Sequence, residues 1–295
     1  MVKEVTRKAM IIRESGRSSD YITPSFGYGC LFNCTYCYMK RHVPNGLTIA
    51  KNSNEILTEI NNHVMFADVE KPNQTHKEYI TYDISCNEDF ALHHKYHNWE
   101  MIFEFFKNHP KAMGTFATKT IPVEFLKYNP EGKVRIRFSL MPENIRQILE
   151  PNTSTIKERL HAVRLFQDAG YDVHLNFSPV VVYDGWLKDY EELFLDIREM
   201  SIRQGWHPNF MVHDDKPVKC EVIFLTHNEK KHYDNLRNNL PGEDLLWRPV
   251  IQENKISQYG GKNIRYALEH KAEWINEWRA LHDRVIPWNT IRYIF

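Results

Sequence analysis

The stretch that decides the fold is Gly29-Cys30-Leu31-Phe32-Asn33-Cys34-Thr35-Tyr36-Cys37-Tyr38, which follows the first predicted strand. Three thiolates at the spacing C-x3-C-x2-C can ligate three irons of a [4Fe–4S] cluster and leave the fourth iron open. The alternative is a structural zinc site with His42 as a fourth ligand, although zinc sites more often pair two C-x2-C knuckles. The spacing favours the cluster, with Cys30, Cys34 and Cys37 as its ligands.

Short β-rich runs alternate with helical patterns along the chain. The predicted strands are Tyr21–Phe26, Glu78–Ile84, Ala112–Ala117, Val134–Leu140, Asp172–Val181 and Lys219–Leu225. The predicted helices are Asn54–Phe66, Trp99–Lys107, Thr155–Ala169, Trp186–Arg203, Asn228–Asn239 and Asn263–His282. Strands that are each followed by a helix indicate βα units and a parallel sheet. We therefore predict an α/β fold, a partial (βα)6 barrel with a carboxyl-terminal helical extension.

Polar and reactive residues follow four of the predicted strands. They are Cys30 to Cys37, Ser85 to Asp89, Lys119 and Ser139. In parallel α/β folds the carboxyl ends of the strands gather at one edge, where reactive groups collect. We expect these residues to form the site of a barrel domain at residues 1–227. Residues 228–295 would be an extension that closes the barrel mouth and contacts substrate, within one compact unit.

Composition excludes several classes of protein. The chain of 295 residues is 42% hydrophobic, which suits a full apolar core and not a disordered tail or a fibre. Its 38 basic and 38 acidic residues cancel, so no overall field draws it to nucleic acid or membrane. The longest uncharged run, Tyr21–Met39, carries proline, glycine and polar residues and cannot span a bilayer as an apolar helix. Without an apolar amino-terminal segment, we expect a cytoplasmic protein.

The cysteine stretch resembles that of the radical S-adenosylmethionine (radical SAM) superfamily, and the chain as a whole resembles the spore photoproduct lyase family. The motifs that carry this likeness, in matching order, are Asp83–Asp89, Phe116–Lys119, Arg135–Ser139, Glu150–Ser154, Gly170–Tyr171, Ser178–Pro179 with Gly185–Trp186, and Tyr259–Gly260. The resemblance implies a [4Fe–4S] cluster and S-adenosyl-L-methionine as cofactors. It also implies a lyase that repairs the methylene-bridged thymine dimer of spore DNA.

The resemblance implies catalytic roles for three residues. Cys86 matches the thiol that gives a hydrogen atom to the product thymine radical, a task that suits a weak S–H bond. Its alternative role is that of an inert core cysteine. Tyr36 and Tyr38 match tyrosines that return a hydrogen atom so that the cofactor is regenerated, and their alternative role is packing against the cluster.

Five further positions match binding residues of the family. Lys119 and Ser139 are implied to hold the cofactor carboxylate, and Ser85 is expected to bind the cofactor beside them. Gln258 and Tyr259 match a loop that is implied to touch the lesion.

The chain departs from the family pattern at three places. Gln258 replaces a common arginine, and Asn87-Glu88-Asp89 replaces Thr-Ser-Asp, which puts an extra carboxylate near the cofactor. Only 29 residues precede Cys30, where the resemblance leads us to expect a longer amino-terminal region. These departures leave open a radical SAM enzyme that acts on another modified base or on a non-DNA substrate. A zinc-stabilised nucleic-acid-binding module without catalysis is a further alternative.

Partners follow from the same resemblance. Residues 1–51 hold eight basic and three acidic residues, and a second basic segment lies between Lys230 and Arg265, so both could contact DNA phosphates. A DNA strand with a thymine lesion is the expected partner, with an electron donor such as flavodoxin or ferredoxin.

Two other groups of residues carry no expected function. We interpret His93, His94 and His97 as solvated or capping histidines and not as a second metal site. Cys220 is expected to pack in the core.

Overall fold

The computed structural model describes residues 2–16, 18–41, 46–66, 71–73, 75–210, 217–256 and 260–295. These residues form two compact units. The first comprises Met1–Leu31, Met39–Phe138 and Ala162–His174, and the second comprises Phe32–Tyr38, Ser139–His161 and Leu175–Phe295. The cysteine stretch therefore begins in the first unit and continues in the second.

The main sheet of the first unit is parallel. Strands β3 (Tyr21–Ile22), β6 (Ile80–Asp83), β7 (Ala112–Thr118) and β8 (Val134–Ser139) are neighbours in that order. Strand β2 (Arg13–Glu14) pairs antiparallel with β3 at the edge. Every residue of β6 and β8 is buried, which is typical of parallel sheets whose two faces are both covered. The strands predicted in the regions of β6, β7 and β8 are confirmed.

Helices α1 (Ser53–Phe66) and α2 (Trp99–Asn108) belong to the same unit. The side chain of Asn98 caps α2 by accepting a hydrogen bond from the N–H of Met101. The unit also has an aromatic core of fully buried rings, to which α2 contributes Phe103; the others are Phe90, Phe116 and Phe125.

A second, three-stranded sheet of the first unit was not predicted. It has the order β1 (Val2–Val5), β5 (Leu47–Ala50) and β4 (Gly27–Gly29). The single strand predicted at Tyr21–Phe26 was wrong, because β3 ends at Ile22 and β4 begins at Gly27 in a different sheet. Pro24 lies between them and has no N–H to give to a sheet ladder, which explains the break.

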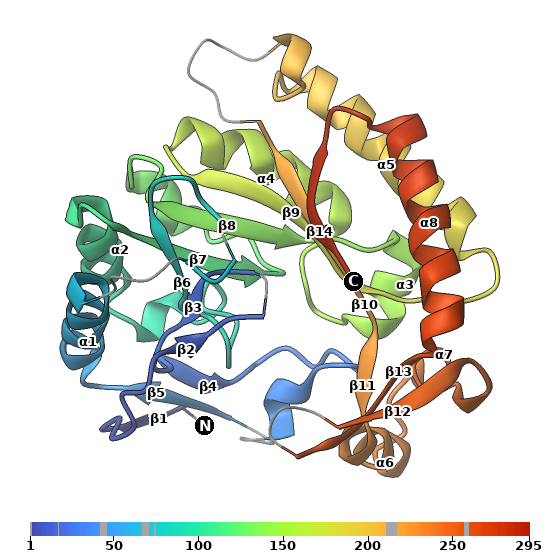
Figure 1. Cartoon of the computed structure of the whole chain (residues 1–295), viewed down its shortest axis with the longest axis horizontal. Coiled ribbons are helices and arrows are strands. Elements are labelled where there is room, and N and C mark those ends of the chain that lie inside the picture. The colour runs from blue at the N-terminus through green and yellow to red at the C-terminus, as the bar shows by residue number, and fades with distance from the viewer. Residues whose placement is uncertain are drawn as a thin grey trace. The chain divides into compact units, whose positions relative to one another are not determined.

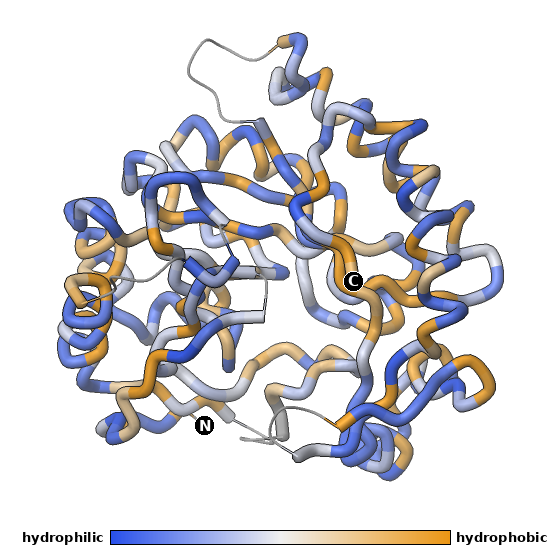
Figure 2. Tube along the Cα trace, in the orientation of Figure 1, coloured by the Kyte–Doolittle hydropathy of each residue, from blue (hydrophilic) through white to orange (hydrophobic). Residues whose placement is uncertain are grey.

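The second unit contains the larger part of β9 (Asp172–Val180), followed in sheet order by β10 (Lys219–Phe224) and β14 (Thr290–Ile294). Helices α5 (Trp186–Arg203) and α8 (Leu268–Val285) pack against each other (Figure 1). Both alternate apolar and polar residues along their length (Figure 2), as helices with one buried face do.

The carboxyl-terminal part contains an antiparallel sheet with the order β11 (Thr226–Asn228), β13 (Lys262–Tyr266) and β12 (Gln252–Ile256). The helix predicted to begin at Asn263 was wrong at its start, because residues 262–266 pair with β12 and the helix begins at Leu268. Ile264 and Tyr266 are buried at alternate positions, the period of a strand. The extension therefore contains strands as well as helices.

The remaining helices are short, apart from α4. They are α3 (Glu143–Leu149), α4 (Ile156–Asp168), α6 (Glu229–Arg237) and α7 (Glu243–Leu246), with 3-10 turns at Tyr38–Arg41, His94–Tyr96, Val123–Lys127, Pro208–Phe210 and Pro249–Ile251. Within the described ranges, none of the helices is both long and apolar enough to cross a membrane.

Candidate functional site

The cysteine loop starts at a glycine whose backbone has a left-handed conformation. Gly29 ends β4 with φ of 90°, a conformation that residues with a side chain rarely adopt. Its N–H donates a 3.0 Å hydrogen bond to the carbonyl of Asn87. The buried Cys30 follows directly, so the first predicted ligand leaves the strand at a fixed point.

The other two predicted ligands lie on a tight turn of the second unit. The N–H of Cys37 donates to the carbonyl of Cys34 at 3.1 Å. Between them, the buried Thr35 donates its N–H to the carbonyl of Leu149 at 2.9 Å. Cys34 is buried and Cys37 is half-buried. A closed turn of this kind keeps two thiols on one short loop, which suits a thiolate-bound cluster.

Tyr36 is tied to a buried ion pair in the same unit. Its hydroxyl donates a short hydrogen bond to Glu150, whose other carboxylate oxygen lies 2.9 Å from the guanidinium of Arg159. Burial, and then the negative charge of Glu150, raise the pKa of Tyr36 well above its usual range, so the phenol stays protonated. Tyr38, by contrast, is 43% exposed.

Ser139 lies beside this ion pair. Its carbonyl accepts a 2.6 Å hydrogen bond from Arg159, and its hydroxyl accepts one of 3.3 Å from Asn176. The side chain is buried at the end of β8.

Cys86 lies on the turn after β6. The hydroxyl of Ser85 donates to the carbonyl of Glu88 at 2.7 Å and accepts from the N–H of Phe90 at 3.2 Å, which fixes the turn. The Cys86 side chain is half-buried, and its sulfur accepts a 3.8 Å hydrogen bond from the guanidinium of Arg13. The turn therefore presents a partly accessible thiol beside a cation.

Lys119 follows β7 and is positioned through its backbone. Its N–H donates to the carboxylate of Asp89 at 3.0 Å, and the same carboxylate accepts a 2.8 Å hydrogen bond from Thr118. Asp89 therefore joins the end of β7 to the turn that carries Cys86.

Two histidines next to this turn correct an expectation. His93 and His97 are not solvated, because both are buried and both bind Glu88, at 3.0 Å and 2.9 Å. Burial raises the pKa of Glu88, but the charge of His97 and the hydrogen bond from His93 outweigh it, so the pKa is lowered. Glu88 is thus engaged with two histidines inside the first unit.

A second buried carboxylate was missed by the sequence analysis. Glu243 binds His227 at 3.0 Å and His232 at 2.6 Å, and it also accepts from the amide of Asn235. That amide donates a 2.8 Å hydrogen bond to the carbonyl of Thr35. The only sequence indication was two histidines five positions apart, His227 on β11 and His232 in α6, and this signal is too weak to find such a network.

Three residues of interest lie outside the described ranges, namely His42, Gln258 and Tyr259. Among the described residues, no group of three or more His, Cys, Asp or Glu side chains has the arrangement of a metal site. The assignment of a cluster therefore rests on the type and spacing of the cysteines.

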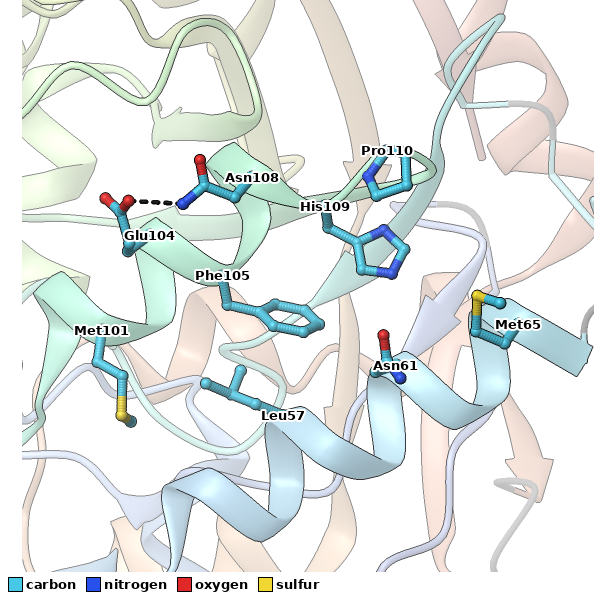
Figure 3. Close-up of a pocket in the computed structure, with 9 residues that line it drawn as sticks. All are labelled: Leu57, Asn61, Met65, Met101, Glu104, Phe105, Asn108, His109 and Pro110. Carbon is cyan, nitrogen blue, oxygen red and sulfur yellow. Dashed lines mark hydrogen bonds between the residues drawn. The ribbon is translucent and has the colours of Figure 1, made fainter.

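A surface pocket of the first unit holds none of the predicted site residues. It has a volume of about 560 Å³ and lies between α1 and α2 (Figure 3). Its lining residues are Leu57, Asn61, Met65, Met101, Glu104, Phe105, Asn108, His109 and Pro110. The lining is mostly apolar and lacks convergent charged groups, so the pocket is not the candidate site.

The arrangement of strands and cysteine loop defines the chain first as a partial-barrel α/β protein of the radical SAM type. A solved structure of spore photoproduct lyase complexed with dinucleoside spore photoproduct has this fold, with a TM-score of 0.84, 21% identity, and coverage of 100% of this chain and 82% of that chain. The sequence profile of the spore photoproduct lyase family matches residues 2–295. The chain belongs to the spore photoproduct lyase family.

Two curated relatives are similar over a shorter stretch. Spore photoproduct lyase of Bacillus subtilis is 28% identical over 64% of this chain and 54% of its own length. The protein of the same name from a Geobacillus strain is 29% identical over 65% of this chain and 54% of its own length. The alignments thus cover about half the length of each relative.

Proposed function

We propose that this chain is a radical SAM lyase that repairs spore photoproduct, the methylene-bridged thymine dimer, in DNA. The observation that carries the proposal is the half-buried thiol of Cys86, held on a strand-end turn of a chain that belongs to this family. A substrate radical needs a hydrogen donor at such a position, and a thiol is well suited because its S–H bond is weak.

The cysteine loop fits a [4Fe–4S] cluster by its donor set. Cys30, Cys34 and Cys37 would hold three irons, and the fourth would bind S-adenosyl-L-methionine. When bound, these groups would supply the one-electron chemistry that removes a hydrogen atom from carbon 6 of the lesion. The protein supplies position and exclusion of water.

Lys119 and Ser139 are the proposed partners of the cofactor carboxylate. An ammonium and a hydroxyl provide a charge-assisted and a neutral hydrogen bond to such a group. Ser85 was expected beside them, but its hydroxyl already donates to Glu88 and accepts from Phe90. We therefore propose that Ser85 serves the cofactor region mainly by shaping the turn.

Cys86 would complete the repair after the methylene bridge breaks. Its S–H bond is cleaved homolytically, the hydrogen atom forms a C–H bond on the thymine methyl radical, and a thiyl radical remains. Tyr36 and Tyr38 would then pass a phenol hydrogen atom to the thiyl radical of Cys86, and the phenoxyl radical so formed would take a hydrogen atom from 5′-deoxyadenosine, so that the cofactor can re-form. The protonated state of Tyr36 suits this role, since a phenolate has no hydrogen atom to give.

DNA carrying the lesion is the proposed substrate, with Gln258 and Tyr259 as proposed contacts and flavodoxin or ferredoxin as the proposed reductant. A solved relative complexed with dinucleoside spore photoproduct supports this choice. One of the three departures that leave another modified base open as a substrate is weakened, because Glu88 is buried with His93 and His97.

An anaerobic assay tests the proposal. Reduced protein reconstituted with iron and sulfide is incubated with S-adenosyl-L-methionine and DNA that carries spore photoproduct, and thymine and 5′-deoxyadenosine are followed by mass spectrometry. We expect both products. Deoxyadenosine without restored thymine would overturn the substrate, and colourless protein with stoichiometric zinc would overturn the enzyme.

A further inference from the structure

Glu88, His93 and His97 form a buried cluster directly under the start of the cysteine loop. Glu88 is 1% exposed and His93 is fully buried. One oxygen of Glu88 binds Nδ1 of His93 at 3.0 Å and Nε2 of His97 at 2.9 Å. All three residues and the loop up to Leu31 belong to the first unit.

The other nitrogen of His93 reaches the loop itself. The backbone N–H of Leu31 donates a 3.3 Å hydrogen bond to Nε2 of His93. Because Nε2 accepts, the proton of a neutral imidazole must be on Nδ1, where it is donated to Glu88. Glu88 therefore fixes both the tautomer and the orientation of His93.

The packing around the cluster leaves it little freedom. A Cβ atom on Gly27 would come within 2.5 Å of the Glu88 carboxyl atoms, so glycine is needed for this close approach. The ring of Phe90 stacks on that of His97, with centroids 4.7 Å apart. The backbone on both sides of Cys30 is anchored, at Gly29 by Asn87 and at Leu31 by His93.

We propose that Glu88 and His93 act as positioning residues that fix the backbone at Leu31, so that Cys30 is held in the arrangement that takes up the iron–sulfur cluster. Two hydrogen bonds in series connect the Glu88 carboxylate, through the His93 imidazole, to the backbone N–H of Leu31. Such a chain orients a segment that carries a metal ligand without contacting the metal. The inference rests on the proposed function only for the identity of the metal group. The anchoring of Leu31 can be measured without it.

Two substitutions of His93 separate its two hydrogen bonds. In His93→Asn the amide reaches no farther than Nδ1 does, so it keeps a donor for Glu88 and loses the acceptor for Leu31. In His93→Gln the longer side chain brings an acceptor to the place of Nε2. His97→Gln is the matched control, because its amide still donates to Glu88 and Leu31 is left unchanged.

Hydrogen exchange of the Leu31 amide in the metal-free protein is the first readout. We expect about tenfold faster exchange in His93→Asn than in the wild type, the effect of losing one hydrogen bond. His93→Gln should recover most of the protection, and His97→Gln should match the wild type. Equal exchange in His93→Asn and the wild type, or an equal increase in His97→Gln, would overturn the inference.

Iron and sulfide content after reconstitution, with the rate of iron loss to a chelator, is the second readout. We expect His93→Asn to lose iron several-fold faster than His97→Gln. If the Leu31 amide responds as expected but the wild-type protein takes up no iron, the positioning role holds and the proposed cofactor fails. Iron retention in His93→Asn equal to that of the wild type would refute the link to the cluster.

Discussion

The guanidinium of Arg13 donates a 3.8 Å hydrogen bond to the sulfur of Cys86. The two residues are 73 positions apart and meet because the edge strand β2 pairs with β3, which in turn pairs with β6. A guanidinium also offers N–H donors to phosphate and carbonyl oxygens. A substrate oxygen that binds Arg13 would therefore lie next to the proposed hydrogen donor.

Replacing Cys86 with alanine should separate radical formation from product quenching. We expect Cys86→Ala to retain the cluster and cofactor cleavage but to divert the product radical to adducts, since no thiol is available to donate a hydrogen atom. Mass spectrometry of the DNA digest measures this. Clean thymine from the variant would remove Cys86 from the mechanism. The control is Cys220→Ala, which removes a buried thiol beside His282 in the second unit. This variant should still restore thymine.

Removing the hydroxyl of Tyr36 should uncouple repair from cofactor regeneration. In Tyr36→Phe we expect more cofactor consumed per thymine restored, together with a loss of about 1–2 kcal/mol of stability from the hydrogen bond to Glu150.

The ratio of 5′-deoxyadenosine to thymine checks this prediction. Tyr38→Phe serves as a comparison, because its 43% exposed ring should change stability by less than about 0.5 kcal/mol. An unchanged ratio in Tyr36→Phe would exclude the phenol from hydrogen return.

The buried pair of Asp172 and Arg135 should dominate acid stability. Their carboxylate and guanidinium are 2.7 Å apart, and 6% or less of each side chain is exposed. Burial raises the pKa of Asp172, but the charges of Arg135 and His174 outweigh it and hold the pKa well below its usual range. The stabilisation is therefore present above about pH 4 and is lost as the pH falls further.

We expect Asp172→Asn to lose about 3 kcal/mol at pH 7, because Arg135 is left buried without its charge partner. Between pH 7 and pH 3, the free energy of unfolding should fall less in the variant than in the wild type. Urea denaturation at both values measures this. Asp168→Asn removes a half-exposed partner of Arg164 and should cost less than about 1 kcal/mol. Equal losses in the two variants would contradict the prediction.

Gly27 should not tolerate a side chain. A Cβ atom there would overlap the carboxyl group of Glu88, so we expect Gly27→Ala to cost about 1–3 kcal/mol. Gly16→Ala is a suitable control, because nothing lies within 4 Å of its Cβ position. Chemical denaturation compares the two, and equal stabilities would mean that Glu88 moves away at no cost.

Hydrophobic pattern was sufficient for much of the secondary structure. The helix predicted at Trp186–Arg203 has the bounds of α5, and the strand predicted at Asp172–Val181 differs from β9 by one residue. A long segment whose apolar residues recur with a single helical or strand period determines its own secondary structure. The prediction from this pattern failed at Tyr21–Phe26 and at Asn263. There, short segments form strands because they pair with strands that are distant in the chain.

The sequence by itself determined which chemical groups this protein has, because a C-x3-C-x2-C loop after a strand and a cysteine after the next predicted strand are local features. Only the tertiary structure decided what holds them. His93 meets Leu31 across 62 positions, and Glu150 meets Tyr36 across 114. Hydrogen bonds of this kind depend on how the chain folds back on itself, and burial then decides whether a carboxylate such as Glu88 serves the site or the scaffold.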